Sequence, residues 1–580
     1  MSMLLRVRMD AMSAGREPLG DEYAGWGGRG LIDKILTNEV APTCHPLGSE
    51  NKVIFANGPL AGTRTSSAGR LSVGGKSPLT GGIKEANAGG IAGDAMARLG
   101  LRAIVVEGKP AHDGLLLLVV GLDSARLVRA DDLRGLGTYA LVEELFTRYG
   151  RKIAVICIGP AGEHRLALAG VAVNDNDGSP SRYAARGGMG AVMGAKGLKA
   201  IVLLDEGVDV PIADPAALRE ARKRYVAALR EHPVTGRAFA EIGTVMSLES
   251  IRALGGLPIR NFSQGELDEE LPELTGEGIR QTIIERGGEG RTTHSCMPGC
   301  TIRCSNVFPD KAGKAIVSPL EYESLVLLGT NIGLLSVDEA ARLNYICNDY
   351  GLDTMETGVA LGVAMEAGLL GFGDFGGVVG LLEEVAKGST VGRVIGQGAT
   401  VVGRVFGVER VPACKGQGMS AYDPRAVKSL GVTYATSTMG ADHTAGFTFY
   451  AKVDHHAPQG QVETSRKSQI VRAALDSLGL CAFVMSALVD KPDIISDLVN
   501  AVDGTDHGPS LVPDLGKEVL RMERAFNAAA GFSPADDRIP GFMRSEPLPP
   551  YGLKFDVPEE EMAHLFDELE AADARSGGLT

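Results

Sequence analysis

Hydrophobic residues in the first third of the chain come in short runs, which are typical of buried β-strands. Further along, hydrophobic residues recur every three to four positions between charged ones, as in amphipathic helices. The pattern therefore predicts an α+β fold. Predicted strands cover residues 4–9, 103–107, 115–120, 153–158, 167–173 and 200–204, and the clearest predicted helices cover residues 216–232 and 337–350.

The same pattern divides the chain into three parts, because 580 residues exceed a single core. The predicted parts are a β-rich domain (1–208) and two mainly helical domains (209–415 and 416–580). Near the end, residues 558–572 are predicted to form an acidic amphipathic helix for packing or oligomer contacts. Its inward-facing residues would be Met562, Leu565, Phe566 and Leu569.

Glycine-rich loops lie between the predicted strands, at residues 58–90 and 186–196. Both mix glycine with Ser, Thr, Lys and Arg, a composition that binds phosphate groups through backbone N–H groups and cations. Neither is a clean nucleotide fingerprint. The glycine that follows Gly188 and Gly190 comes one position too late, and Lys196 lacks the surroundings of a Walker lysine. Ordinary turn glycines are the alternative.

Three cysteines, Cys296, Cys300 and Cys304, follow one another at intervals of four residues. This spacing would place the thiols on one helix face, whereas the proline and glycine between the first two favour a tight loop. In either case, converging thiolates are soft ligands for an iron–sulfur cluster or zinc. Cys481 is the best candidate for a fourth ligand.

Two other polar features are candidates for chemistry. Glu321 and Glu323 enter an apolar run that reads as a helix start, so one carboxylate is expected to face the interior, where carboxylates are rare unless paired or functional. The alternative is that both are solvated first-turn charges. His443 lies in a loop of small residues, where a histidine is either catalytic or packed in a core.

Two six-residue segments, 348–353 and 476–481, share the frame polar-x-x-Gly-Leu-(Asp or Cys). Each follows a helical pattern. Two equivalent loops from two helical domains could grip the two halves of one pseudo-symmetric ligand.

Composition excludes several classes of protein. The net charge of −14 argues against a nucleic-acid binder. Eight cysteines in so long a chain are not a disulfide scaffold. Charges appear too early at the N-terminus for a signal peptide, and no apolar run is long enough to span a membrane. We expect a soluble cytoplasmic protein with reduced thiols.

These segments together make the chain resemble the tungsten-containing aldehyde ferredoxin oxidoreductases over nearly its whole length. The matching segments are residues 70–90, 186–196, the cysteine triplet, 320–324, 348–353, 415–425, His443 with its neighbours, and 476–481. The resemblance implies a β-rich base domain on which two helical domains enclose a tungsten (or molybdenum) held by two pyranopterins. It also implies a [4Fe–4S] cluster beside one pterin.

The resemblance assigns roles to individual residues. It implies that Cys296, Cys300, Cys304 and Cys481 ligate the cluster. Arg70 would lie between cluster and pterin, and Asn87, Arg186 and the backbone at Gly187 would lie near a magnesium ion bridging the pterin phosphates. The other implied cofactor-binding residues are Gly89, Asn348, Leu352, Asp353, Asp476 and Leu480. Glu323 and His443 would stand next to the tungsten, with Tyr322 and Tyr422 lining the pocket.

Two departures from the family pattern are visible. The first gap in the cysteine triplet holds three residues instead of two, as in the mesophilic, multi-subunit members. The first Gly-Leu loop also begins with Asn348, where an aspartate is usual.

The implied activity is oxidation of an aldehyde to a carboxylic acid, with water as the oxygen source and tungsten as the two-electron acceptor. Glu323 would be the general base, and His443 would hydrogen-bond the carbonyl oxygen. Electrons would leave through the cluster to ferredoxin or an iron–sulfur subunit, in an oligomer.

Two other functions stay open. The same cofactor could reduce an aromatic acyl-thioester. Alternatively, the chain could be a non-catalytic subunit with a structural cluster, or with zinc bound by the three cysteines and His294.

Overall fold

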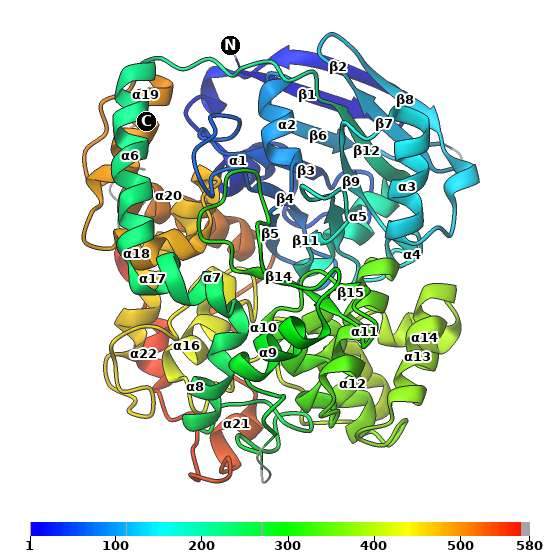
Figure 1. Cartoon of the computed structure of the whole chain (residues 1–580), viewed down its shortest axis with the longest axis vertical. Helices are drawn as coiled ribbons and strands as arrows, with labels where there is room; N and C mark the ends of the chain where they lie inside the picture. The colour runs from blue at the N-terminus through cyan, green and yellow to red at the C-terminus, as the bar shows by residue number, and fades with distance from the viewer. Residues whose placement is uncertain (1, 112, 268–270, 570–580) are drawn as a thin grey trace.

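The computed structural model describes residues 2–111, 113–267 and 271–569. Its N-terminal part contains two six-stranded sheets, seen as blue and cyan arrows in the upper part of Figure 1. The first has the strand order β2-β1-β6-β3-β4-β5 and the second β8-β7-β12-β9-β10-β11. The strands of the first sheet are β1 Met3–Arg8, β2 Ser13–Pro18, β3 Val53–Asn57, β4 Leu71–Lys76, β5 Ile83–Ala88 and β6 Leu101–Glu107. Those of the second are β7 Leu116–Val120, β8 Ala125–Arg129, β9 Ile153–Cys157, β10 Val171–Val173, β11 Arg182–Ala184 and β12 Leu198–Leu204.

The second sheet repeats the first. In each sheet the first and last strands along the chain pair in parallel, β1 with β6 and β7 with β12, and the other pairs are antiparallel. A short helix precedes the last strand of each copy, α2 (Ala92–Arg98) in the first and α5 (Met189–Ala195) in the second. The sequence analysis did not predict this duplication.

All six predicted strands exist, although the run at 167–173 is a strand only over Val171–Val173. The prediction that residues 58–90 form one long loop was wrong, because β4 and β5 lie within it. Their glycines are needed for packing: a Cβ at Gly74 would lie 2.6 Å from Ile32, and one at Gly75 would lie 2.4 Å from a backbone oxygen of Lys52. The glycines in this segment are therefore required by close packing within a sheet and do not indicate a loop.

Helices dominate the rest of the chain, in the lower and left parts of Figure 1. The two clearest predicted helices are confirmed as α6 (Pro215–Glu231) and α11 (Val337–Tyr350). Further helices are α1 Gly28–Glu39, α3 Thr138–Tyr149, α10 Tyr322–Leu327, α12 Thr354–Glu366, α13 Phe375–Lys387, α16 Lys428–Thr436, α17 Gln461–Leu478, α19 Asp493–Asp503 and α20 Leu511–Ala529. The mixed β-rich and helical composition confirms the predicted α+β class.

Packing crosses both predicted domain boundaries. Helix α6, from the second predicted part, packs against α19 of the third, and one hydrophobic core runs from Ala161 to Leu569. The three-part division therefore stays a prediction.

The acidic helix predicted at residues 558–572 is shorter in the structure, where α22 covers Glu559–Ala563. Its four predicted inward residues are all buried. Residues 570–572 lie outside the described part of the chain.

Within the described residues, no single helix is long and apolar enough to cross a membrane. Two segments, Tyr322–Ile332 and Val337–Tyr350, meet the length and hydropathy required only when taken together, across a bend of 113°.

The two Gly-Leu segments have the same conformation. Helices α11 and α17 end at Gly351 and Gly479 in the left-handed region, with φ of 74° and 68°. In each, the following leucine N–H bonds back to the carbonyl five residues earlier, 2.8 Å in the first loop and 3.0 Å in the second. Glycine supplies this positive φ without strain, and the bonds satisfy carbonyls at the helix end.

Each loop docks on an equivalent glycine of the duplicated sheets. A Cβ on Gly159 would lie 2.4 Å from the Tyr350 carbonyl oxygen, and one on Gly58 would lie 2.1 Å from that of Leu478. Helix α3 of the second copy packs on α11, as α1 of the first copy packs on α17. The molecule therefore presents two pseudo-symmetric halves, each ending in a Gly-Leu loop.

Gly58→Ala is expected to destabilise the fold by about 1–3 kcal/mol, because the new methyl group overlaps the docked carbonyl. The melting temperature of the purified protein measures this. Gly15→Ala is a matched control, because no atom lies within 4 Å of the Cβ position at Gly15. Equal melting temperatures for the two variants would contradict the docking argument.

Candidate functional site

Two adjoining cavities lie where the sheets meet the helices. The larger has a volume of about 300 Å³ and the smaller about 140 Å³. Both are lined by Arg70, Thr244, Glu323, His443, Cys481 and Phe483. Asn348 and Leu352 of the first Gly-Leu loop line the larger cavity, and Asp476 of the second lines the smaller. The two loops therefore open onto one composite site.

The cysteine triplet lies on a loop between β13 (Arg291–His294) and β14 (Ser305–Pro309), which excludes the helical alternative. Cys296 and Cys304 line the larger cavity together with Cys481, which follows the second Gly-Leu loop. Cys300 is also buried, with its Sγ 3.3 Å from the Ser67 hydroxyl. The Cys481 N–H donates to the Ser67 carbonyl at 2.8 Å. One backbone segment thus joins the distant cysteine to the triplet.

The four thiols influence one another's ionisation. A hydrogen bond with Cys296 lowers the pKa of Cys300 to about 6. Burial raises the pKa of Cys304, and the charges of Glu321 and Cys481 raise it further. Burial also raises the pKa of Cys481. Four such thiols do not ionise together unless a positive group binds them, so this donor set fits a metal cluster.

His294 does not fit the zinc alternative. Its Nδ1 lies 2.8 Å from the Arg182 guanidinium and its Nε2 lies 3.0 Å from Asp177, so both ring nitrogens already have partners. In the described residues, no group of three His, Cys, Asp or Glu side chains is placed to hold a single metal ion.

Glu323 lines both cavities, whereas Glu321 lines only the larger one. Glu323 lies in the first turn of α10 and is 16% exposed, and the Tyr422 hydroxyl donates to its Oε1 at 2.7 Å. Burial raises the pKa of Glu323 to about 7, and the hydrogen bond from Tyr422 opposes this rise. His443 Nε2 lies 3.4 Å from the same Oε1. Glu321 instead bonds Thr244 and Ser305, so the two carboxylates have different environments.

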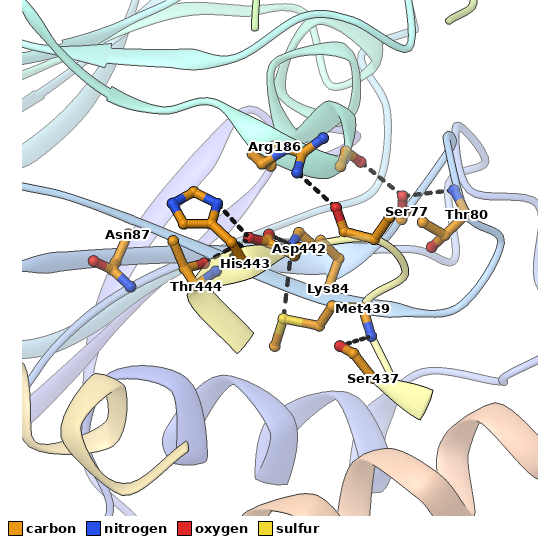
Figure 2. Close-up of polar contacts among 12 residues, drawn as sticks. Ser77, Thr80, Lys84, Asn87, Arg186, Ser437, Met439, Asp442, His443 and Thr444 are labelled. Carbon is orange, nitrogen blue, oxygen red and sulfur yellow. Dashed lines mark hydrogen bonds and ion pairs between the residues drawn. The ribbon is translucent and has the colours of Figure 1, made fainter. Parts of the chain in front are cut away.

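A buried ion pair lies beside the histidine (Figure 2). Lys84 Nζ is 2.5 Å from Asp442 Oδ2, and His443 Nδ1 is 3.9 Å from Asp442 Oδ1. Burial would raise the pKa of Asp442, but Lys84 and Arg186 hold it well below its usual range. Burial lowers the pKa of His443 to about 3, although Asp442 opposes the shift. The imidazole is therefore neutral at physiological pH.

Arg70 and Asn87 connect the cysteine side to the second Gly-Leu loop. Arg70 donates to the side chain and, at 3.1 Å, to the carbonyl of Asn87, and Asn87 Nδ2 donates to Asp476 Oδ1 at 3.0 Å. Burial would lower the pKa of Arg70, but Cys481 and Cys296 raise it. Gly89 lines the larger cavity, where a Cβ would lie 3.3 Å from Cys296 Sγ.

Several expected residues lie near this site without lining either cavity. Tyr322 is fully buried and donates to the Ala421 carbonyl at 2.7 Å, with its ring 5.2 Å from that of Tyr422. It therefore packs behind Tyr422 instead of lining the pocket. The other expected residues that line neither cavity are Cys300, Arg186, Gly187, Asp353 and Leu480, all buried. Arg186 links the halves by donating to Asp353 at 3.3 Å and to the Ala441 carbonyl at 2.8 Å.

Sequence reasoning missed some residues of the smaller cavity. Arg472 lines it and lies four positions before Asp476 on α17, so the helix period could have revealed it. The rings of Phe239, Phe447, Tyr450 and Phe483 also line it. They come from separate segments, and no spacing in the sequence connects them.

Comparison with known proteins matches nearly the whole chain to one family. Residues 4–205 match the family model "Aldehyde ferredoxin oxidoreductase, N-terminal domain", and residues 220–569 match "Aldehyde ferredoxin oxidoreductase, domains 2 & 3". The tungsten-containing aldehyde ferredoxin oxidoreductase of Pyrococcus horikoshii is 31% identical over 94% of this chain and 92% of its own length. The enzyme of the same name from Pyrococcus furiosus is 32% identical over 94% of this chain and 91% of its own.

Two further matches are more distant in sequence. An aliphatic sulfonate oxidoreductase WOR-like subunit of Pyrococcus furiosus is 25% identical over 92% of this chain and 88% of its own. The solved active-site complex BamBC of benzoyl coenzyme A reductase, in complex with 1,5-dienoyl-CoA, superposes with a TM-score of 0.82 at 18% identity. The match covers 98% of this chain and 94% of that one. The chain belongs to the aldehyde ferredoxin oxidoreductase family of enzymes, as the sequence motifs had indicated.

Proposed function

We propose that this oxidoreductase converts aldehydes to carboxylic acids at a tungsten bis-pyranopterin centre, and that electrons leave through a [4Fe–4S] cluster. One observation carries the proposal: Glu323 and His443 line the same cavity as Cys296, Cys304 and Cys481. A proton-accepting carboxylate and three of the proposed cluster ligands therefore line one cavity. The electron acceptor would be ferredoxin or an iron–sulfur subunit.

The residues present fit the cofactor. Asn348 and Leu352 would contact one pterin, and Asp476 with Asn87 the other, because the two loops open onto the same composite site. His443 Nδ1 is a buried nitrogen that lacks a hydrogen-bond partner among the described residues, so it can serve a bound group. When bound, the tungsten centre supplies a two-electron acceptor.

A magnesium ion between the pterin phosphates would lie near Asn87 and the backbone at Gly187. The side chain of Lys84 packs against Gly187, where a Cβ would lie 2.4 Å from the lysine Cγ, and its Nζ is paired with Asp442 (Figure 2). Arg186 adds a second buried cation in the same region. Cations and a close backbone approach suit phosphate binding.

The side chains divide the proton chemistry between them. Glu323 accepts a proton from water or from the product, because a carboxylate with a pKa near 7 is an effective base at neutral pH. Neutral His443 donates a hydrogen bond to the substrate carbonyl oxygen and so stabilises developing negative charge. The hydroxyl of Tyr422 holds the Glu323 carboxylate in place.

The pH dependence follows from the raised pKa of Glu323. Glu323 acts as a base only when deprotonated, so kcat/KM is expected to rise with pH and to level off above about 7. An ordinary glutamate, with a pKa of about 4.3, would give a flat profile in this range. Initial rates between about pH 6 and 8 measure the profile. A flat profile would contradict the role of Glu323 as a base with a raised pKa. A pH-dependent profile that persists in the Glu323→Gln variant would assign the titration to another group.

Elemental analysis of the purified protein for W, Mo, Fe and Zn tests the proposal as a whole. Tungsten with iron supports the proposal. Molybdenum with iron supports the same function with molybdenum in place of tungsten. Iron without tungsten or molybdenum would favour a non-catalytic iron–sulfur subunit, and zinc alone would revive the zinc alternative.

A further inference from the structure

We infer, on the basis of the proposed function, that the preferred substrates are aldehydes borne by a single aromatic ring, of which benzaldehyde is the simplest. The inference rests on the smaller cavity, called the aromatic pocket below. It is lined by the rings of Phe239, Tyr422, Phe447, Tyr450 and Phe483 and ends at Glu323 and His443.

The rings form a continuous wall from one end of the pocket to the other. Phe483 and Phe239 have centroids 4.5 Å apart, and Phe239 and Tyr450 are 6.4 Å apart at 69°. Tyr450 continues to Phe447 at 5.5 Å and 76°, and Phe447 meets Tyr422 at 5.4 Å and 70°. Edge-to-face contacts of this kind suit the ring quadrupole, so a substrate ring can join the same arrangement.

Two of the rings, Phe447 and Tyr422, contact the proposed catalytic side chains at one end of the pocket. Phe447 lies edge-on to the His443 ring at 5.8 Å and 75°, and Tyr422 donates to Glu323. Tyr450, between Phe239 and Phe447 in this series, is 41% exposed, so the wall of rings reaches the molecular surface beside it. A ring that contacts Phe447 would therefore hold its aldehyde carbon near both proposed catalytic side chains.

Size limits the occupant. The pocket has a volume of about 140 Å³, and an apolar protein cavity of ~150 Å³ accepts benzene. Part of the pocket is bordered by Arg70, Asn87 and Asp476, which we assign to the cofactor, so one ring is the upper limit.

The Ser247 and Thr244 hydroxyl groups in the lining already form hydrogen bonds within the protein. Ser247 Oγ bonds the Tyr450 hydroxyl at 2.9 Å, and the Thr244 hydroxyl bonds Glu321. A polyhydroxy aldehyde would lose its water contacts without finding free partners on these side chains, and unpaired polar groups disfavour binding strongly. The guanidinium of Arg472 also lines the pocket, so sugar-like aldehydes are disfavoured relative to aromatic ones, not excluded.

The test compares kcat/KM of the holoenzyme for benzaldehyde, cyclohexanecarbaldehyde, heptanal and glyceraldehyde. Benzaldehyde is expected to exceed each of the others by about tenfold or more, because the rings recognise planarity and charge distribution as well as apolar surface. The cyclohexane analogue has the same number of heavy atoms and lacks only the aromatic ring.

Intrinsic reactivity differs among aldehydes, so variants supply an internal comparison. Phe239→Leu is expected to lower the ratio of benzaldehyde to cyclohexanecarbaldehyde kcat/KM by about threefold or more, because it removes one ring from the wall. Phe406→Leu, which changes an exposed phenylalanine on α15 (Ala399–Phe406), is the matched control and should leave the ratio unchanged. Calorimetric titration of wild-type holoenzyme with benzoate and with cyclohexanecarboxylate gives a readout independent of turnover, with benzoate expected to bind more tightly.

The outcomes separate this inference from the function on which it rests. Aldehyde oxidation with equal kcat/KM for the aromatic and alicyclic substrates, and equal binding of the two carboxylates, would overturn the inference and leave the function standing. Failure to oxidise any aldehyde, with reduction of benzoyl-CoA instead, would overturn both.

Discussion

Replacing Glu323 by glutamine is expected to lower turnover by about 10²-fold or more while leaving the metal content unchanged. The amide has almost the same shape as the carboxylate but cannot take up a proton. Tyr422 can still donate to the amide oxygen, so the position of the side chain is kept. Steady-state rates together with elemental analysis separate lost chemistry from a lost cofactor.

Glu321→Gln is the matched contrast, because this neighbouring carboxylate bonds Thr244 and Ser305, whereas Tyr422 and His443 contact Glu323. The turnover of Glu321→Gln should fall by less than about tenfold. If Glu323→Gln turns over at nearly the wild-type rate, Glu323 is not the base. If both variants lose activity equally, the effect is one of local charge, not of proton transfer.

The second large effect is expected at Cys481. Cys481→Ala should remove cluster iron and abolish electron transfer to an external acceptor, because the triplet supplies only three of the four thiolates that a [4Fe–4S] cluster needs. Iron analysis and visible absorption of the purified variant measure the cluster, and reduction of a dye acceptor measures the exit of electrons.

Cys157→Ala provides the control for Cys481→Ala. Cys157 is fully buried in β9 and lines neither cavity of the site, so its removal costs packing but no ligand. Full iron content in Cys481→Ala would show that the fourth ligand lies elsewhere. Equal loss of iron in both variants would indicate general instability of the fold.

The sequence determined the residues that carry the chemistry and much of the local structure. Short apolar runs predicted six strands, and helix-period spacing gave α11 with its bounds. The positive φ of Gly351 and Gly479 requires glycine, so the two Gly-Leu loops could be paired before their shape was known. Cysteine spacing likewise marked the triplet, since soft metal sites need thiols at close intervals.

Tertiary structure alone decided three matters. It brought Cys481 to the triplet through the Ser67 carbonyl, and it set Glu323 apart from Glu321 by their hydrogen-bond partners. It also gathered the rings of the aromatic pocket from segments more than two hundred residues apart. Local patterns record propensity and the exposure of one face, whereas these contacts depend on how distant segments dock, which short-range spacing does not encode.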